Sequence, residues 1–312
     1  MAESVGATSF GRGSLSDPAA ESQATRSSHR EWRRDPAATT GLVLLAPAIV
    51  LLVGLFVVPI VRIVWQALSE PTFGLDRFRE FWLTLASRRA LLTTLRISAI
   101  VTVLCTMLSV PIAWELYSTR SRWVRIALWS AALFPLWTSG VVRNYAFTII
   151  LQRRGILNTW LLSLGIIREP LALLYTEAAV VMGIFYTMLP YAILPIYASF
   201  AAQDEQLVPA AESLGASRLR AIVDVALPLA APSIFAAAAI VFVISVGFYI
   251  TPILLGGPQS PFLATIVDTQ IYRLFDFPGA AATASILFFT AFIIVGGAWP
   301  AVGLDRIRRV LG

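Results

Sequence analysis

The chain has 312 residues, of which 57% are hydrophobic and only 13% are charged. A soluble domain typically carries about a quarter charged residues, so this composition predicts that lipid surrounds much of the protein. The formal net charge of +6 arises from basic residues that are all arginine, most of which lie between the apolar stretches or in the terminal segments. Membrane proteins place their cations in this way, so we do not expect nucleic-acid binding.

Reactive side chains are scarce. Cys105 is the single cysteine and lies in an apolar stretch, while His29 is the single histidine and lies in the polar N-terminal segment. These two residues cannot build a disulfide framework, a zinc cluster or a histidine-based catalytic triad. We therefore expect no metal site, no catalytic residues and no enzymatic activity.

Residues 1–40 are rich in Ser, Ala, Gly and Arg and lack periodic apolar residues, which predicts a disordered basic tail on the cytoplasmic side. Arg33 and Arg34 resemble a twin-arginine export signal. However, the apolar run that follows, residues 41–68, is far longer than the core of a signal peptide. We interpret this run as a membrane span, so residues 41–312 are predicted to form one transmembrane domain.

Six stretches are long and apolar enough to cross a bilayer, because a helix needs about 20 residues to span about 30 Å of hydrocarbon. They are residues 42–66, 91–115, 125–150, 175–199, 232–255 and 281–303. The fold is therefore predicted to be all-α, with six transmembrane helices. The third stretch is interrupted by Pro135, Gly140, Arg143 and Asn144, and prolines lie within others. Such breaks are tolerated where neighbouring helices or a water-lined cavity satisfy the freed backbone groups, so they indicate a path through the protein.

Arginine counts indicate the orientation, since cytoplasmic connections carry an excess of basic residues. With the N-terminus inside, the cytoplasmic segments hold thirteen arginines and the external connections eight. The other three, Arg62, Arg96 and Arg143, fall toward the outer ends of their spans. Arg62 and Arg96 can extend to the interface, whereas Arg143 lies deeper and either faces a cavity or packs inside. We expect both termini in the cytoplasm.

The connection between the fourth and fifth spans, about residues 201–231, has a specific pattern. Pro209 favours the start of a helix and Gly215 the position just past its end, which predicts a short helix between them. Ser217 can cap a second helix, which Leu227-Pro228 is expected to end before the fifth span. Taken alone, the pattern also fits an amphipathic connector that lies at the membrane interface.

The residues of this connection resemble the EAA loop of permease subunits of binding-protein-dependent ABC importers. In that family the pattern is Glu-Ala-Ala, three residues, Gly, nine residues, an aliphatic residue, one residue and Leu-Pro. Ala210-Ala211, Gly215, Val225 and Leu227-Pro228 match it, whereas Pro209 replaces the glutamate and Glu212 follows three residues later as a partial substitute. The resemblance implies an ATPase-coupling loop that includes Pro209, Ala210, Ala211, Glu212, Leu214, Gly215, Ala216, Leu227 and Pro228.

Further stretches resemble the spermidine/putrescine permease branch of this family. They are residues 142–147, 155–158, 189–191, 247–252 and 255–258. With them the resemblance covers the chain from the first span to the C-terminus. It implies a type I ABC importer permease in a bacterial inner (cytoplasmic) membrane, with a polyamine as the solute. Relatives in this branch carry other small solutes, so an amino acid derivative, a phosphonate or an iron chelate is the alternative.

The chain has no lysine and no phosphate-binding loop of the Gly-x-x-x-x-Gly-Lys-Ser/Thr type, so it cannot bind ATP in that manner. The resemblance implies that other subunits complete the transporter: two ATPase subunits, a second homologous permease and a periplasmic solute-binding protein. We expect no cofactor on this chain, because ATP is used by the partner subunits. The helix pair over residues 209–226 is expected to lie in a groove of an ATPase subunit and to transmit its closure.

The translocation path is expected where polar or aromatic side chains coincide with breaks in the spans, because aromatic rings can stack a cationic solute. The candidates are Arg143, Asn144, Tyr145, Tyr186, Tyr191, Phe248 and Tyr249. Aromatic residues in spans also serve commonly as packing or interface residues. The carboxylates of Glu115, Glu177 and Asp268 either attract a polyamine or lie on the solvated surface near span ends. Arg143 would repel a cation, which argues against a polyamine.

Two other classes of membrane protein fit the pattern less well. A secondary transporter driven by an ion gradient usually has internal repeats and an acidic residue in mid-span, and the sequence has no clear example of either. A scaffold or receptor would explain neither the helix pair that ends at a glycine nor the broken spans.

Overall fold

The computed structural model describes residues 36–70, 73–257 and 260–311, and within them it describes side chains from Leu45 to Ala298. The predicted tail lies outside the described residues except for its last five, which belong to the first described helix. Every element in the described part is helical. The elements are α2 Pro36–Ser69, α3 Asp76–Leu83, α4 Leu85–Ser118, α5 Arg122–Trp137, α6 Gly140–Leu151, α7 Ile156–Ser163, α8 Glu177–Ala201, α9 Leu207–Ser213, α10 Arg218–Ala221, η2 Ile222–Ala226, α11 Leu227–Val246, η3 Pro252–Gly256, α12 Leu263–Tyr272 and α13 Phe277–Leu311, of which η2 and η3 are π-helical turns.

The all-α prediction is confirmed, and most predicted spans correspond to one long helical stretch. Five stretches of the described chain have the length and apolar composition to cross a membrane: Leu45–Ser69, Leu85–Ser118, Glu177–Ala201, Arg218–Val246 and Phe277–Ala298. A sixth crossing exists if α5 and the bent segment that follows it count as one span. The structure therefore has the six predicted spans only if this broken pair counts as one of them.

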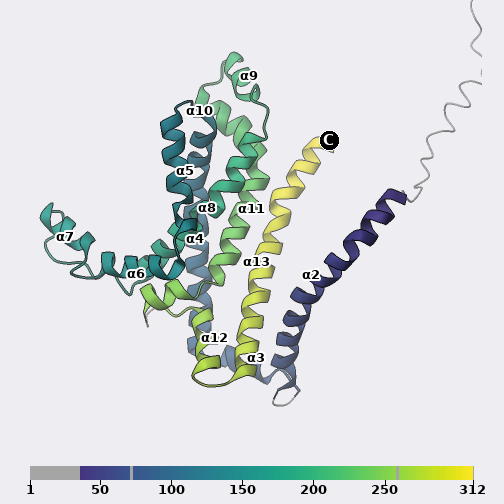
Figure 1. Ribbon diagram of the computed structural model, residues 1–312, viewed down its shortest axis with the longest axis vertical. Coiled ribbons are helices and arrows are strands. Elements are labelled where there is room, and N and C mark those ends of the chain that lie inside the picture. The colour runs from purple at the N-terminus through teal and green to yellow at the C-terminus, as the bar shows by residue number, and fades with distance from the viewer. Residues whose placement is uncertain (1–35, 71–72, 258–259, 312) are drawn as a thin grey trace, which may run out of the picture. The chain divides into compact units, whose positions relative to one another are not determined.

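The third predicted span, residues 125–150, is broken at the interruption that its sequence indicated. α5 ends at Trp137 and α6 begins at Gly140, and the segment Gly140–Ser163 is bent by 106° relative to α5. Thr138 and Ser139 between them have ψ angles of 134°, so helical hydrogen bonding stops there. α5 packs against α4 and α8, whereas α6 and α7 lead away from the bundle (Figure 1).

The centre of the bundle consists of α4, α8 and α11, each of which packs against the other two. Ile97, Val101 and Cys105 recur at four-residue spacing on α4 and belong to one buried apolar cluster with residues of α8 and α11. Other positions of α4, such as Leu92 and Met107, expose apolar side chains, which lipid would cover in a membrane.

The chain divides into two units, Met1–Pro59 and Ile60–Gly312. In the first unit only part of α2 is described, and nearly all its apolar side chains from Leu45 onward are exposed, as a span in contact with lipid requires. The second unit contains α3 to α13 and all the features that follow.

The second unit has two ends that carry different connections (Figure 1). At one end, α9 and α10 lie beside the connection between α4 and α5. At the other, α3 and α12 pack against the first part of α13. We call these the loop end and the far end.

Candidate functional site

The segment between α8 and α11 forms a helix-turn-helix at the loop end. Its first helix, α9, runs from Leu207 to Ser213 and so begins two residues before Pro209, where the sequence placed its start. Gly215 then turns the chain with a φ of +94°, a conformation that glycine adopts without strain. The hydroxyl oxygen of Ser217 accepts a hydrogen bond from the N–H of Arg220 at 3.4 Å and caps α10. The glycine turn and the serine cap are present as predicted.

The prediction that Leu227-Pro228 ends the second helix is wrong. α10 continues through the π-helical turn η2 into α11, so that one helical stretch runs from Arg218 to Val246. In a regular α-helix, the ring of a proline clashes with the carbonyl four residues earlier. The wider π-helical turn directly before Leu227 gives the ring of Pro228 room, and the helix continues into the fifth span.

Gln203 ties the end of α8 to this turn. Its side-chain amide donates to the backbone carbonyl of Ala226 at 3.0 Å, although the two residues are 23 positions apart. Val208 of α9 packs against the same region, in a cluster that includes Ile196 and Phe200 of α8. The end of α8, α9 and the start of α11 are therefore held together as one body.

The outer surface of this loop carries exposed apolar side chains. Leu214 is 91% exposed, Leu219 is 73% exposed, and Val223 is 48% exposed one turn beyond Leu219. Arg220 and Asp224 lie among them and form an exposed ion pair at 3.2 Å. We call Leu214, Leu219 and Val223 the coupling surface.

The other predicted loop residues lie around this surface. The exposed ones are Pro209, Ala210, Glu212, Gly215 and Pro228, and the partly buried ones are Ala211, Ala216 and Leu227. Pro209 and Glu212 line a polar hollow of about 260 Å³ between α9 and the end of α4. Glu212 forms no ion pair with any described residue, so its carboxylate is available to a partner.

Arg143 of α6 connects the two sides of the break between α5 and α6. Its guanidinium group donates to the carbonyl of Pro135 at 2.8 Å and lies over the ring of Tyr186, 5.9 Å from the ring centre. Pro135 belongs to the last turn of α5, whose free carbonyls carry partial negative charge and stabilise a cation. Of the two positions considered for Arg143, the structure favours packing inside, with both the helix end and the aromatic face as partners.

Asn144 is buried where α6, α8 and η3 meet. Its amide donates to the carbonyl of Gly140 at 2.7 Å, and its side-chain oxygen has no hydrogen-bond partner in the described part of the chain. A methyl group on Gly183 of α8 would come within 2.7 Å of the side chains of Thr251 and Leu255. The close approach of α8 to Thr251 and Leu255 therefore depends on a glycine at position 183.

The remaining path candidates do not gather into one site. The exposed ones are Tyr145, Tyr191 and Tyr249, and the partly buried ones are Tyr186 and Phe248. The hydroxyl of Tyr249 donates to Asp268 of α12 at 2.7 Å. The contact between Arg143 and Tyr186 is the pairing of predicted residues that the structure brings together.

Sequence reasoning missed Gln203, Gly183 and Thr251. Gln203 lies in a polar connection, where a glutamine is ordinarily solvated, and no local pattern connects it with Ala226. Gly183 did carry a usable signal, since a small residue in the middle of a span is typical of close helix packing in membranes.

Comparison with known proteins places this arrangement in a family. Residues 83–308 match the family described as binding-protein-dependent transport system inner membrane component. The chain is 32% identical over 211 residues to the spermidine/putrescine transport system permease protein PotB of Escherichia coli (strain K12), a match that covers 68% of this chain and 76% of PotB. It is 30% identical over 235 residues to the molybdenum transport system permease protein ModB of Mycobacterium bovis (strain ATCC BAA-935 / AF2122/97), covering 73% of this chain and 86% of ModB.

Solved structures have the same fold. A bacterial ABC transporter involved in the import of the acidic polysaccharide alginate matches with a TM-score of 0.70 and 19% identity, over 88% of this chain and 98% of that chain. The bacterial alginate transporter in complex with an alginate pentasaccharide-bound periplasmic protein matches with a TM-score of 0.70, over 86% of this chain and 96% of that chain. The family is established by the sequence matches. This chain therefore belongs to the binding-protein-dependent transport system inner membrane components, as a permease subunit of an ABC importer.

Proposed function

We propose that this chain forms the translocation path for a polyamine such as spermidine or putrescine and couples transport to separate ATPase subunits through the coupling surface. The observation that carries the proposal is the exposure of Leu214 and Leu219 at the loop end. Burying one leucine side chain contributes about 1.5–3 kcal/mol, so two largely exposed leucines five positions apart in one loop favour a protein partner that covers them.

Lipid is a poor candidate for covering these leucines. The loop carries exposed charged residues on both sides of them, among them Asp204, Glu212 and Arg218. Burying such charges in hydrocarbon costs several kcal/mol, so this loop is expected to lie in water unless a protein covers it.

A movement of the coupling surface would be transmitted directly to the membrane spans. The helical stretch from Arg218 to Val246 contains part of the coupling surface and the fifth span, and Gln203 fastens the fourth span to the same turn. Closure of two ATPase subunits would therefore move the fourth and fifth spans together. Such rigid-body motion needs two discrete packings whose balance nucleotide binding changes.

The loop end is proposed to face the cytoplasm of a bacterium, with both termini on that side of the inner membrane. The arginine distribution supports this orientation. The complete transporter would contain two ATPase subunits that bind the ATP, a second homologous permease, and a periplasmic solute-binding protein at the far end. The solved alginate transporter in complex with a periplasmic protein supports a partner of the last kind.

The polyamine assignment is supported by the identity with PotB, whose name records spermidine and putrescine transport. The charge of Arg143 is no longer a strong argument against a cation, because the end of α5 and the Tyr186 ring offset it. The exposed aromatic residues Tyr145 and Tyr191 are proposed as path residues that a cation can stack on. The relation to ModB supports the alternative, which is another small solute in the same kind of path.

The coupling proposal is tested by purifying the tagged chain in detergent from cells that express the whole transporter. The unmodified chain should retain its ATPase subunits. The double variant Leu214→Asp/Leu219→Asp should lose them, because two carboxylates would enter an apolar contact. Leu75→Asp is the matched control, since Leu75 is 68% exposed and lies at the far end before α3. Retention of the ATPase subunits by the double variant would refute the coupling surface.

The solute is tested by uptake of radiolabelled putrescine, spermidine and molybdate into cells that lack their own systems for these solutes. Polyamine uptake that depends on the ATPase subunits supports the proposal. Uptake of molybdate alone would assign the other solute class. Uptake by this chain without any partner, driven by an ion gradient, would identify a secondary transporter instead.

A further inference from the structure

A second site lies at the far end, away from the coupling surface and the helix break. Residues of α3, α4, α12 and the first part of α13 line a cavity of about 520 Å³, within the range of about 300–1,000 Å³ that is usual for small-molecule sites. Its charged residues are two arginines, Arg77 and Arg273, and three carboxylates, Glu80, Asp268 and Asp276. The lining therefore has one more negative than positive charge.

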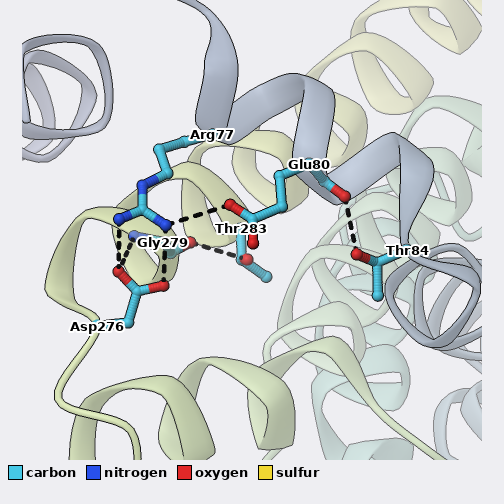
Figure 2. Close-up of polar contacts among 6 residues, drawn as sticks. All are labelled: Arg77, Glu80, Thr84, Asp276, Gly279 and Thr283. Carbon is cyan, nitrogen blue, oxygen red and sulfur yellow. Dashed lines mark hydrogen bonds and ion pairs between the residues drawn. The ribbon is translucent and has the colours of Figure 1, made fainter. Parts of the chain in front are cut away.

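Much of the charge is paired within the protein. Arg77 lies between Glu80, at 3.1 Å, and Asp276, at 3.4 Å, as Figure 2 shows. Asp276 also accepts a hydrogen bond from the N–H of Gly279 at 3.1 Å, at the start of α13. This network fastens α3 to the α12–α13 corner. Asp268 and Arg273 are outside it, and neither has an ion-pair partner among the described residues.

Acceptor oxygens remain available in this lining, beside the donors of the Arg273 guanidinium group, the Gln270 amide and the Ser87 hydroxyl. The side-chain oxygen of Gln270 is shielded from solvent and has no hydrogen-bond partner in the described chain. Ser87 is only 7% exposed, lines the cavity, and makes no side-chain hydrogen bond to a described residue. Asp268 accepts from Tyr249 through one of its two oxygens. The threonines of the lining add no free donor, because each donates its hydroxyl to a backbone carbonyl: Thr84, Thr265, Thr269 and Thr283.

An ion pair on α4 indicates how the cavity lies relative to the membrane. Arg96 pairs with Glu177 at the start of α8, and both side chains are exposed. Exposed charges are costly in hydrocarbon, so this pair is expected at its boundary. From Arg96 to Ser118 the helix measures about 33 Å, close to the hydrocarbon thickness of about 30 Å. Ser87 lies about 13 Å beyond Arg96 along α4, which places the cavity in the aqueous layer.

We infer that this far-end cavity binds a primary alkylammonium group of the solute before the solute enters the membrane path. An ammonium group has three N–H donors and no acceptor, so it complements the free oxygens of Asp268 and Ser87. Ile253 of η3 also lines the cavity, and η3 packs on α6 and α8, so the site adjoins the broken region of the bundle. The inference rests on the proposed function for its outward orientation and for the polyamine that supplies the ammonium.

A cysteine in the cavity tests the inference directly. Ser87→Cys places a thiol in the lining of the cavity, whereas the only native cysteine, Cys105, is 0% exposed. The whole reconstituted transporter is treated from outside with 2-aminoethyl methanethiosulfonate, which carries an ammonium group, and with its sulfonate analogue. We compare the rate of the ammonium reagent divided by the rate of the sulfonate reagent. This rate ratio should be about tenfold higher at Ser87→Cys than at Ser163→Cys, an exposed position of α7. Putrescine should slow the ammonium reagent several-fold at Ser87→Cys and not at Ser163→Cys.

Two charge variants show whether the Asp268 carboxylate is responsible for the rate ratio and for the protection by putrescine. Added to Ser87→Cys, Asp268→Asn should reduce both the rate ratio and the protection by putrescine. Asp76→Asn makes the same charge change on α3 at a residue that does not line the cavity, and it should leave both unchanged. Equal rate ratios at positions 87 and 163 without protection would overturn the inference.

Polyamine uptake measured in parallel separates this inference from the proposed function. Normal uptake without protection at Ser87→Cys would refute the cavity site and leave the permease assignment in place. Protection by putrescine in a transporter that moves no polyamine would support the cavity site and refute the polyamine as cargo.

Discussion

Truncation of Leu214 is the sharpest single test of the coupling surface, because this residue is the most exposed of the large apolar side chains in the described chain. Leu214 follows α9 with a φ of −82°, which alanine also adopts readily. Since only 9% of its surface is covered within the chain, Leu214→Ala should leave the stability of the permease unchanged. Any loss of function would then come from contact with a partner.

The expected loss follows from the carbon atoms removed. Burial contributes about 0.8 kcal/mol per carbon, and alanine keeps one of the four side-chain carbons of leucine. A partner that covers the side chain completely would thus lose about 2 kcal/mol of binding free energy, equivalent to a roughly 30-fold rise in the dissociation constant.

The measurement is the dissociation constant between the ATPase subunits and the permease pair held in lipid nanodiscs, together with the thermal unfolding midpoint of the permease. Leu75→Ala serves as the control, because Leu75 is 68% exposed at the far end, and its effect on binding should be less than about twofold. If Leu214→Ala also changed the dissociation constant by less than about twofold, with both proteins folded, the argument that an ATPase covers this leucine would fail.

Three further substitutions address the glycine turn at Gly215, the hydrogen bond of Gln203 and the close packing at Gly183. Gly215→Val should lower stimulated ATP hydrolysis and uptake, because a φ of +94° costs a β-branched residue about 1–2 kcal/mol or more and reshapes the turn. Gln203→Ala should preserve ATP hydrolysis but reduce the solute moved per ATP, because the Ala226 carbonyl loses a hydrogen bond of about 1 kcal/mol that fastens α8 to η2. Gly183→Ala should lower the unfolding midpoint in detergent, because its methyl group would approach Thr251 to 2.7 Å and overpacking costs about 1–3 kcal/mol.

Each of these variants has a control in the same chain. Gly165→Val introduces the same kind of strain at a φ of +67°, away from the coupling loop. Gln206→Ala removes an exposed glutamine just before α9, and Gly296→Ala adds a methyl group where no atom lies within 4 Å. Effects as large in the controls as in the variants would show that the named contacts are not responsible.

The spans and the glycine turn could be predicted because each depends on a local signal. A run of about 20 apolar residues is sufficient to indicate a span, and Gly215 followed by Ser217 is sufficient to indicate a turn and a cap. The failure at Leu227-Pro228 has a different origin. Proline ordinarily ends a helix, but a π-helical turn accommodates it here, and local sequence gives no indication of that turn.

The break in the third span shows how far local signals reach. Pro135 and Gly140 indicated an interruption, but neither the 106° bend nor the contact of Arg143 with Tyr186 on α8, which is 43 positions away in the chain. The far-end cavity was beyond prediction for the same reason. Arg77 and Asp276 are 199 positions apart, and only the packing of α3 against α13 brings them together.

The unbroken helix from Arg218 to Val246 has 29 residues and is therefore about 44 Å long. If a rod of this length tilts by about 5°, its far tip travels about 4 Å, which is comparable to the width of an extended amine chain. A small displacement on one face of the membrane would thus be enlarged by geometry alone. Because both tips belong to one stiff body, opening on one face and closing on the other would be simultaneous, which protects the cell from a leak during each cycle.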